Sequence, residues 1–182
     1  MIVAGFSGLR AGELAALRIM DLNLSDAPSV RVSRRLYRVG GELTLDTPKS
    51  ARGIRTVALP AFVAAALREH LALHRVGAAK TDLVFVTAAG RDVLDGYSQV
   101  IRRALDRLGR TDVRMHDLRH SAMTSAAEHG ATLATLMNMA GHSTTNAAQR
   151  YQHATVEHAR KVAAAMDATA AATLQRASRA DG

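Results

Sequence analysis

Cysteine is absent from the 182-residue chain, and aromatic residues make up only 3% of it. The lack of cysteine excludes disulfide bonds, thiolate metal ligands and a cysteine nucleophile. Because rings are few, the core must consist of alanine, leucine, valine and methionine, which favours closely packed helices. No apolar run approaches the ~20 residues that cross a bilayer, and the N-terminal segment lacks the basic region of a signal peptide. These absences predict a soluble, cytoplasmic protein. The length of 182 residues predicts one well-packed domain.

Basic residues outnumber acidic ones. Twenty-four Lys and Arg residues against 16 Asp and Glu residues leave a net charge of +8, and most of the bases are arginine. The planar guanidinium matches phosphate oxygens, and a basic surface collects polyanions. A coding sequence rich in GC would also prefer arginine and alanine, so the composition favours a nucleic-acid partner only modestly.

Hydrophobic spacing at the N-terminal end predicts a helix followed by a small sheet. Leucines recur at helical spacing after Ser7, a candidate N-cap, and predict a helix over residues 7–24. Residues 30–59 show two-residue alternation interrupted by turn signals, which predicts three antiparallel strands.

The pattern in the rest of the chain predicts helices separated by glycines. Pro60 opens a helix that Gly77 closes. Further helices are expected over residues 97–108, 115–129, 132–140 and 156–174. The sequence therefore predicts a mainly α domain with a small antiparallel three-stranded β-sheet, which is an α+β fold.

The segment HDLRHS, residues 116–121, concentrates titratable side chains. On a helix, His116, Arg119 and His120 are spaced i, i+3 and i+4 and share a face. A zinc site is one interpretation, but no Glu stands beside the first His and no third ligand is evident. A surface cluster in which Asp117 pairs with arginine is the ordinary alternative. The third is a phosphate grip with an acid–base imidazole beside it.

Four other residues have a functional and a structural interpretation. Arg10 in GLRAGEL could point its guanidinium into a cleft, or pair with Glu13. Lys49 could reach a substrate from a hairpin tip, or be a solvated turn residue. His142 could bind a ligand or cap a helix, and Tyr151 could be a reactive phenol or a buried ring. Taken singly, no residue favours either interpretation.

Taken together and in this order, the motifs resemble the tyrosine recombinase family of the phage-integrase type. The matching segments are GLRAGEL, the lysine of TPKSARGIRTVALP, HDLRH, GHST and RYQH. The resemblance implies a catalytic domain over residues 1–160, lacking its N-terminal helix and the separate N-terminal DNA-clamping domain of the family. A C-terminal Ala-rich helical tail over residues 161–182 would follow. The alanine at position 140 departs from the large apolar residue that often stands there.

The resemblance implies cleavage and rejoining of double-stranded DNA through a 3′-phosphotyrosine, with no metal and no cofactor. Tyr151 would be the nucleophile. Two arginines and His142 would bind the non-bridging phosphate oxygens. Lys49 would protonate the leaving 5′ oxygen, and His116 would assist proton transfer at the tyrosine. The implied catalytic residues are Arg10, Lys49, His116, Arg119, His142 and Tyr151.

The resemblance also bears on partners. Tails in this family often dock on a neighbouring subunit, which implies a homo-oligomer, a tetramer, on DNA; a tail packed on its own chain fits the sequence equally well. Two alternative functions are a truncated, inactive DNA-binding remnant and a type IB topoisomerase. A purely structural helical module is the third.

Overall fold

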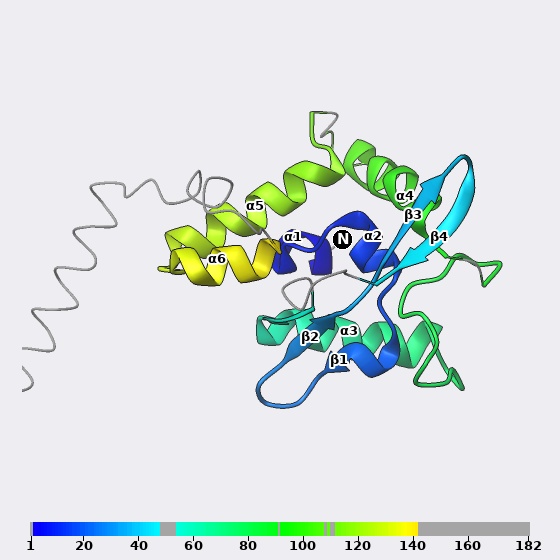
Figure 1. Ribbon diagram of the computed structural model, residues 1–182, viewed down its shortest axis with the longest axis horizontal. Helices are drawn as coiled ribbons and strands as arrows, with labels where there is room; N and C mark the ends of the chain where they lie inside the picture. Colours follow the sequence, from blue (N-terminus) through cyan, green and yellow to red (C-terminus); the bar gives the residue numbers. More distant parts are fainter. Residues whose placement is uncertain (1, 48–53, 91, 108, 110–111, 142–182) are drawn as a thin grey trace, which may run out of the picture.

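Longer helices and small antiparallel strands surround a central pair of short helices (Figure 1). The computed structural model describes residues 2–47, 54–90, 92–107, 109 and 112–141. Its elements are α1 (Ile2–Ser7), α2 (Ala11–Ala15), the 3-10 helix η1 (Ile19–Asp21), β1 (Leu22–Asn23), β2 (Ser29–Val32), β3 (Arg35–Val39), β4 (Glu42–Asp46), β5 (Arg55–Ala58), α3 (Ala61–His74), α4 (Leu94–Arg107), α5 (Met115–Glu128) and α6 (Leu133–Ala140). Within these residues, no helix is both long and apolar enough to cross a bilayer.

Helix α1 lies between α5 on one side and α3 on the other, and packs against both (Figure 1). The main core is aliphatic, as the composition predicts, and joins α1, α2, the sheet and α3. A second cluster joins α5 to α6 through Met123, Leu136 and Ala140. Met139 packs against both clusters. The C-terminal end of α6 is therefore held where the two clusters meet.

The small antiparallel sheet is confirmed, but its strands differ from those expected. Its order is β1-β2-β5, with Val30 opposite Val57, while β3 and β4 form a separate two-stranded ladder. Within the region predicted to form three strands, β2 stops after Val32, and β3 begins at Arg35. Val30 and Val57 belong to the main core, whereas Leu36 of β3 packs with alanines of α2. Apolar residues on the two sides of the break therefore pack into two different clusters.

The single helix expected over residues 7–24 is wrong. Gly8 has a φ of 69°, and Arg10 is extended (φ −74°, ψ 154°), so one helix ends at Ser7 and the next begins at Ala11. The leucines that suggested the helix are buried all the same. The leucine spacing therefore predicts correctly that these residues are buried, but it predicts wrongly that one helix runs through them.

The later helices agree with the prediction. Helix α3 follows Pro60, and α4 begins three residues earlier than expected, at Leu94. Helix α6 begins after Thr132, whose side chain accepts a hydrogen bond from the backbone of Thr135, and ends at Gly141 with a φ of 60°. The helix predicted over residues 156–174 lies outside the described residues.

Candidate functional site

Three arginines cap the C-terminal end of α6. Each arginine donates a hydrogen bond from Nη2 to one of three consecutive carbonyl groups. Arg55 donates to Met139 at 3.3 Å, Arg119 to Ala140 at 2.6 Å, and Arg10 to Gly141 at 3.3 Å. The last carbonyls of a helix lack partners within it and carry the negative end of its dipole. Guanidinium groups satisfy both the hydrogen bonds and the charge, so this helix end gathers arginines from three distant parts of the chain.

Two of these arginines, Arg10 and Arg119, are expected site residues, and they approach from different elements. Arg10 is the N-cap of α2, and its side chain is 45% exposed. Arg119 lies in α5, is buried, and also donates from Nη1 to the carbonyl of Gly8. Its two contacts tie the turn between α1 and α2 to the end of α6. The structure thus brings the two arginines to neighbouring carbonyls although 109 residues separate them (119 − 10).

Glu13 joins the third arginine to this group. Arg55 donates from Nη1 to Oε1 at 3.0 Å and from Nη2 to Oε2 at 2.8 Å, with 4% of the arginine side chain and 8% of the carboxylate side chain exposed. Arg10 donates to the same carboxylate from its backbone nitrogen at 2.8 Å and from Nη1 at 3.2 Å. Burial alone would raise the pKa of Glu13, but hydrogen bonds and charge from Arg55, and then from Arg10, outweigh burial and lower the pKa. The carboxylate is therefore charged.

The sequence interpretation missed Arg55, although a signal for it existed. Residues of β5 alternate between buried and exposed, and Arg55 falls on the buried face with Val57. A charged residue on the core face of a strand needs a paired partner. That alternation identifies an inward-facing arginine six residues after Lys49 (55 − 49), but it does not identify Glu13 as the partner.

Gly141 allows the arginines to come this close. A Cβ atom built there would lie 2.7 Å from Cζ of Arg55 and 3.2 Å from Nη1 of Arg10. The backbone φ of 60° is also in the left-handed region that side chains disfavour. Both the helix end and the packing of two guanidinium groups therefore favour glycine at position 141.

His116 lies in the first turn of α5 and is exposed. Its ring meets that of His120 edge-on, with centroids 4.5 Å apart, so the two histidines share a face as predicted. Asp117 caps the helix by accepting a hydrogen bond from the backbone nitrogen of Arg114 at 2.6 Å. Over the part of the chain that the structure describes, no three His, Asp or Glu side chains are grouped to hold a metal ion.

Three expected site residues lie outside the described residues: Lys49, His142 and Tyr151. Two of them are close in sequence to the arginine cluster. His142 follows Gly141 directly, and Lys49 falls in the connection that leads to β5, where Arg55 stands first. The structure thus places half of the expected set, namely Arg10, His116 and Arg119.

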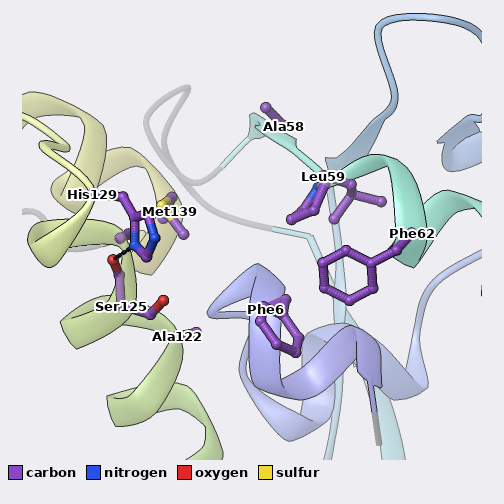
Figure 2. A pocket seen from close by; sticks show the side chains of 10 residues that line it. Phe6, Ala58, Leu59, Phe62, Ala122, Ser125, His129 and Met139 are labelled. Carbon is purple, nitrogen blue, oxygen red and sulfur yellow. Dashed lines mark hydrogen bonds between the residues drawn. The ribbon is translucent and has the colours of Figure 1, made fainter.

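An apolar pocket of about 450 Å³ lies beside this cluster. Figure 2 shows Phe6 and Phe62 on one side of it, with ring centroids 4.8 Å apart in an edge-to-face contact, and His129 and Met139 on the other. His129 is the lone titratable side chain of the lining, and its Nδ1 is hydrogen-bonded to the carbonyl of Ser125 at 2.8 Å. A pocket with so little charge does not suit an anion, whereas the arginine cluster offers the positive charge that an anion requires.

Comparison with known proteins finds a matching family and several similar sequences and structures. Residues 2–158 match the phage integrase family. A protein named putative prophage phiRv2 integrase, from Mycobacterium tuberculosis, is 39% identical over 167 residues, which cover 90% of this chain and 44% of that protein. The integrase of Mycobacterium phage D29 is 32% identical over 174 residues, covering 94% of this chain and 46% of the other. The chain spans about half the length of these relatives.

Solved structures share the fold. The Tn1549 transposon integrase, in a complex with transposon right end DNA, superimposes with a TM-score of 0.72 at 25% identity over 88% of this chain and 55% of the other. The XerA recombinase gives a TM-score of 0.69 at 23% identity over 88% of this chain and 52% of its own. The arrangement of helices around the small sheet is therefore that of these recombinases.

Proposed function

The chain belongs to the phage integrase family, and on that basis we propose that it is the catalytic domain of a site-specific DNA recombinase. It breaks and rejoins double-stranded DNA through a 3′-phosphotyrosine intermediate. The observation that supports this most directly is the convergence of Arg10 and Arg119 on neighbouring carbonyls of α6. Positive groups fixed in one place stabilise the charge that grows on a phosphate during cleavage.

In the proposed reaction, the oxygen of Tyr151 attacks the phosphorus and the bond from phosphorus to the 5′ oxygen breaks. Arg10, Arg119 and His142 hold the non-bridging oxygens. Lys49 gives a proton to the departing 5′ oxygen, and His116 takes the phenol proton. A 5′-hydroxyl then attacks the phosphotyrosine and releases the phenol, so the bond energy is kept for rejoining.

The two described arginines would contribute differently to this reaction. Arg119 is buried, and its hydrogen bonds to Gly8 and Ala140 hold the guanidinium in one orientation. Arg10 is half-exposed, so it can meet a phosphate that arrives from solvent. A guanidinium held before the substrate binds needs no reorganisation during the reaction.

Double-stranded DNA is the proposed partner, and the net charge of +8 supports it. The similar Tn1549 integrase was solved with transposon DNA. We further propose that residues 161–182 dock on a neighbouring subunit, so that the protein acts as a homo-oligomer, a tetramer, on its site.

Trapping of a covalent adduct tests the proposed reaction. The full chain is incubated with a pool of nicked duplexes of random sequence. After cleavage near the nick, the short fragment that carries the 5′-hydroxyl diffuses away, and its loss prevents rejoining. Protein–DNA adducts are then separated under denaturing conditions and the linked strands are sequenced. We expect linked strands that retain a 5′ end label, because the tyrosine holds the 3′ phosphate.

Tyr151→Phe should abolish the adduct. Tyr37→Phe is the matched control, because that ring lies in β3 beneath the Arg35 guanidinium at 4.9 Å and takes no part in the proposed chemistry. An adduct that survives in Tyr151→Phe, or no adduct across the pool, contradicts the proposal. Salt-sensitive DNA binding without any adduct would instead indicate an inactive DNA-binding domain.

A further inference from the structure

The position of Arg55 between Glu13 and α6 suggests a role that none of the expected site residues has. We propose that Arg55 is a positioning residue of the phosphate site: it occupies the Glu13 carboxylate and so keeps the positive charge of Arg10 available for DNA phosphate. This inference rests on the proposed function, because it concerns the same site.

The first observation is how unequally the two arginines share Glu13. Arg55 forms two parallel hydrogen bonds, at 3.0 Å and 2.8 Å, one to each carboxylate oxygen. The Arg10 side chain makes a single contact at 3.2 Å. Two-pronged pairs between guanidinium and carboxylate are the stronger kind. Glu13 is therefore neutralised mainly by Arg55.

The second observation is the charge of the group. Two guanidinium groups and one carboxylate leave a net charge of +1, and the two partners of the strong pair, Arg55 and Glu13, are almost fully buried. Arg10 is the member with an exposed side chain. The excess positive charge thus lies where an anion from solvent can approach it.

Removing Arg55 would redirect Glu13 toward Arg10. A buried carboxylate without its partner is unfavourable, so it draws the remaining nearby cation. Arg10 is already in reach, because its backbone nitrogen donates to Oε2 at 2.8 Å and its Nη1 to Oε1. Its side chain would then pair with the carboxylate through both prongs, and donors that could bind phosphate would be used within the protein.

Arg55 also helps to place the end of α6. Its guanidinium donates to the carbonyl of Met139 and lies against Gly141. A separate hydrogen bond, from Nδ2 of Asn138 to the carbonyl of Thr56 at 2.8 Å, joins α6 to β5 without Arg55. A variant at position 55 should therefore keep α6 attached, so that the charge effect can be measured in a folded protein.

The test compares Arg55→Gln with the double variant Glu13→Gln/Arg55→Gln. Binding of the full chain to a labelled duplex is measured by fluorescence anisotropy over a range of salt concentrations. Each lost phosphate contact lowers the slope of log K against log salt by about 0.9. Arg10→Gln provides the reference for losing its contact.

We expect Arg55→Gln to lower the slope as much as Arg10→Gln does, and the double variant to recover the wild-type slope. Recovery is expected because a neutral Gln at position 13 leaves Arg10 unpaired with any carboxylate. Arg55→Lys keeps the positive charge but cannot form the two-pronged pair with Glu13, so it should show a slope between those of Arg55→Gln and the wild type. A wild-type slope in Arg55→Gln, or no recovery in the double variant, overturns the role of Arg55.

A measurement without DNA keeps this inference separate from the proposed function. NMR of the Arg10 guanidinium in Arg55→Gln should show slowed rotation and solvent exchange, as expected for a two-pronged pair with Glu13. Unchanged Arg10 signals overturn the inference whatever the DNA results are. If the signals change but the wild-type chain does not bind DNA, the proposed function fails and the pairing competition stands.

Discussion

Replacing Gly141 with alanine should strain both the helix end and the buried ion pair beneath it. The left-handed backbone alone costs a side chain about 1–2 kcal/mol. The new methyl group would also lie 2.7 Å from the Arg55 guanidinium, which must retreat by several tenths of an ångström. Arg55 can retreat only by lengthening its hydrogen bonds of 2.8 Å and 3.0 Å to Glu13 and its bond to Met139. Overpacking of this kind adds about 1–3 kcal/mol.

Gly77 offers a matched control. Its φ is 72°, close to the 60° of Gly141, but a Cβ atom there would meet nothing within 4 Å. Gly77→Ala should therefore lose only the backbone part, about 1–2 kcal/mol, and Gly141→Ala about 2–5 kcal/mol in total. Urea unfolding of the full chain measures both, provided that the slopes with denaturant agree. Equal losses in the two variants would refute the reasoning, because they would mean that the arginines yield without strain.

Four further predictions concern stability. The pKa of Glu13 is lowered in the folded state. The charged carboxylate therefore stabilises the fold above its unfolded pKa of about 4.3, and this stabilisation is lost as pH falls through the lower folded pKa. Urea midpoints measured between pH 2 and 7 should decline more steeply in acid for the wild type than for Glu13→Gln. Gly12→Ala should lose about 1–3 kcal/mol of stability or more, because a Cβ atom there would lie 2.2 Å from the backbone oxygen of Leu36. Gly5→Ala, with nothing within 4 Å, should instead gain up to about 1 kcal/mol in the same assay. Thr132→Ala removes the N-cap of α6 and should lose about 1 kcal/mol, and a wild-type thermal midpoint would contradict this.

The sequence predicts the later helices because proline and glycine residues mark where they begin and end. Pro60 opens α3, and Gly141 closes α6 in the left-handed conformation. It fails at residues 7–24, where the leucine spacing is regular but Gly8 and Arg10 interrupt the helix. The leucine spacing does not reveal the contacts that accompany this break, in which Arg119 of α5 donates to the carbonyl of Gly8 and Arg10 donates to the carbonyl of Gly141 at the end of α6.

The site shows the same division between local and distant information. The residue types at Arg10 and Arg119 indicate phosphate chemistry, but only the fold brings them to adjacent carbonyls. The inward direction of Arg55 can be read from the alternation of β5. Its partner, Glu13, stands 42 residues away (55 − 13), and no periodicity links two positions at that separation.

The contacts of Arg119 have a consequence for how the protein is made. One of its bonds spans 111 residues to Gly8, and the other reaches Ala140. Contacts between distant segments form late, because a long loop must close before they stabilise the chain. A chain still on the ribosome, with α6 not yet released, therefore has no assembled anion site. The arginine cluster at the end of α6 should therefore assemble only after residues 133–141 have been synthesised and have packed against the rest of the domain.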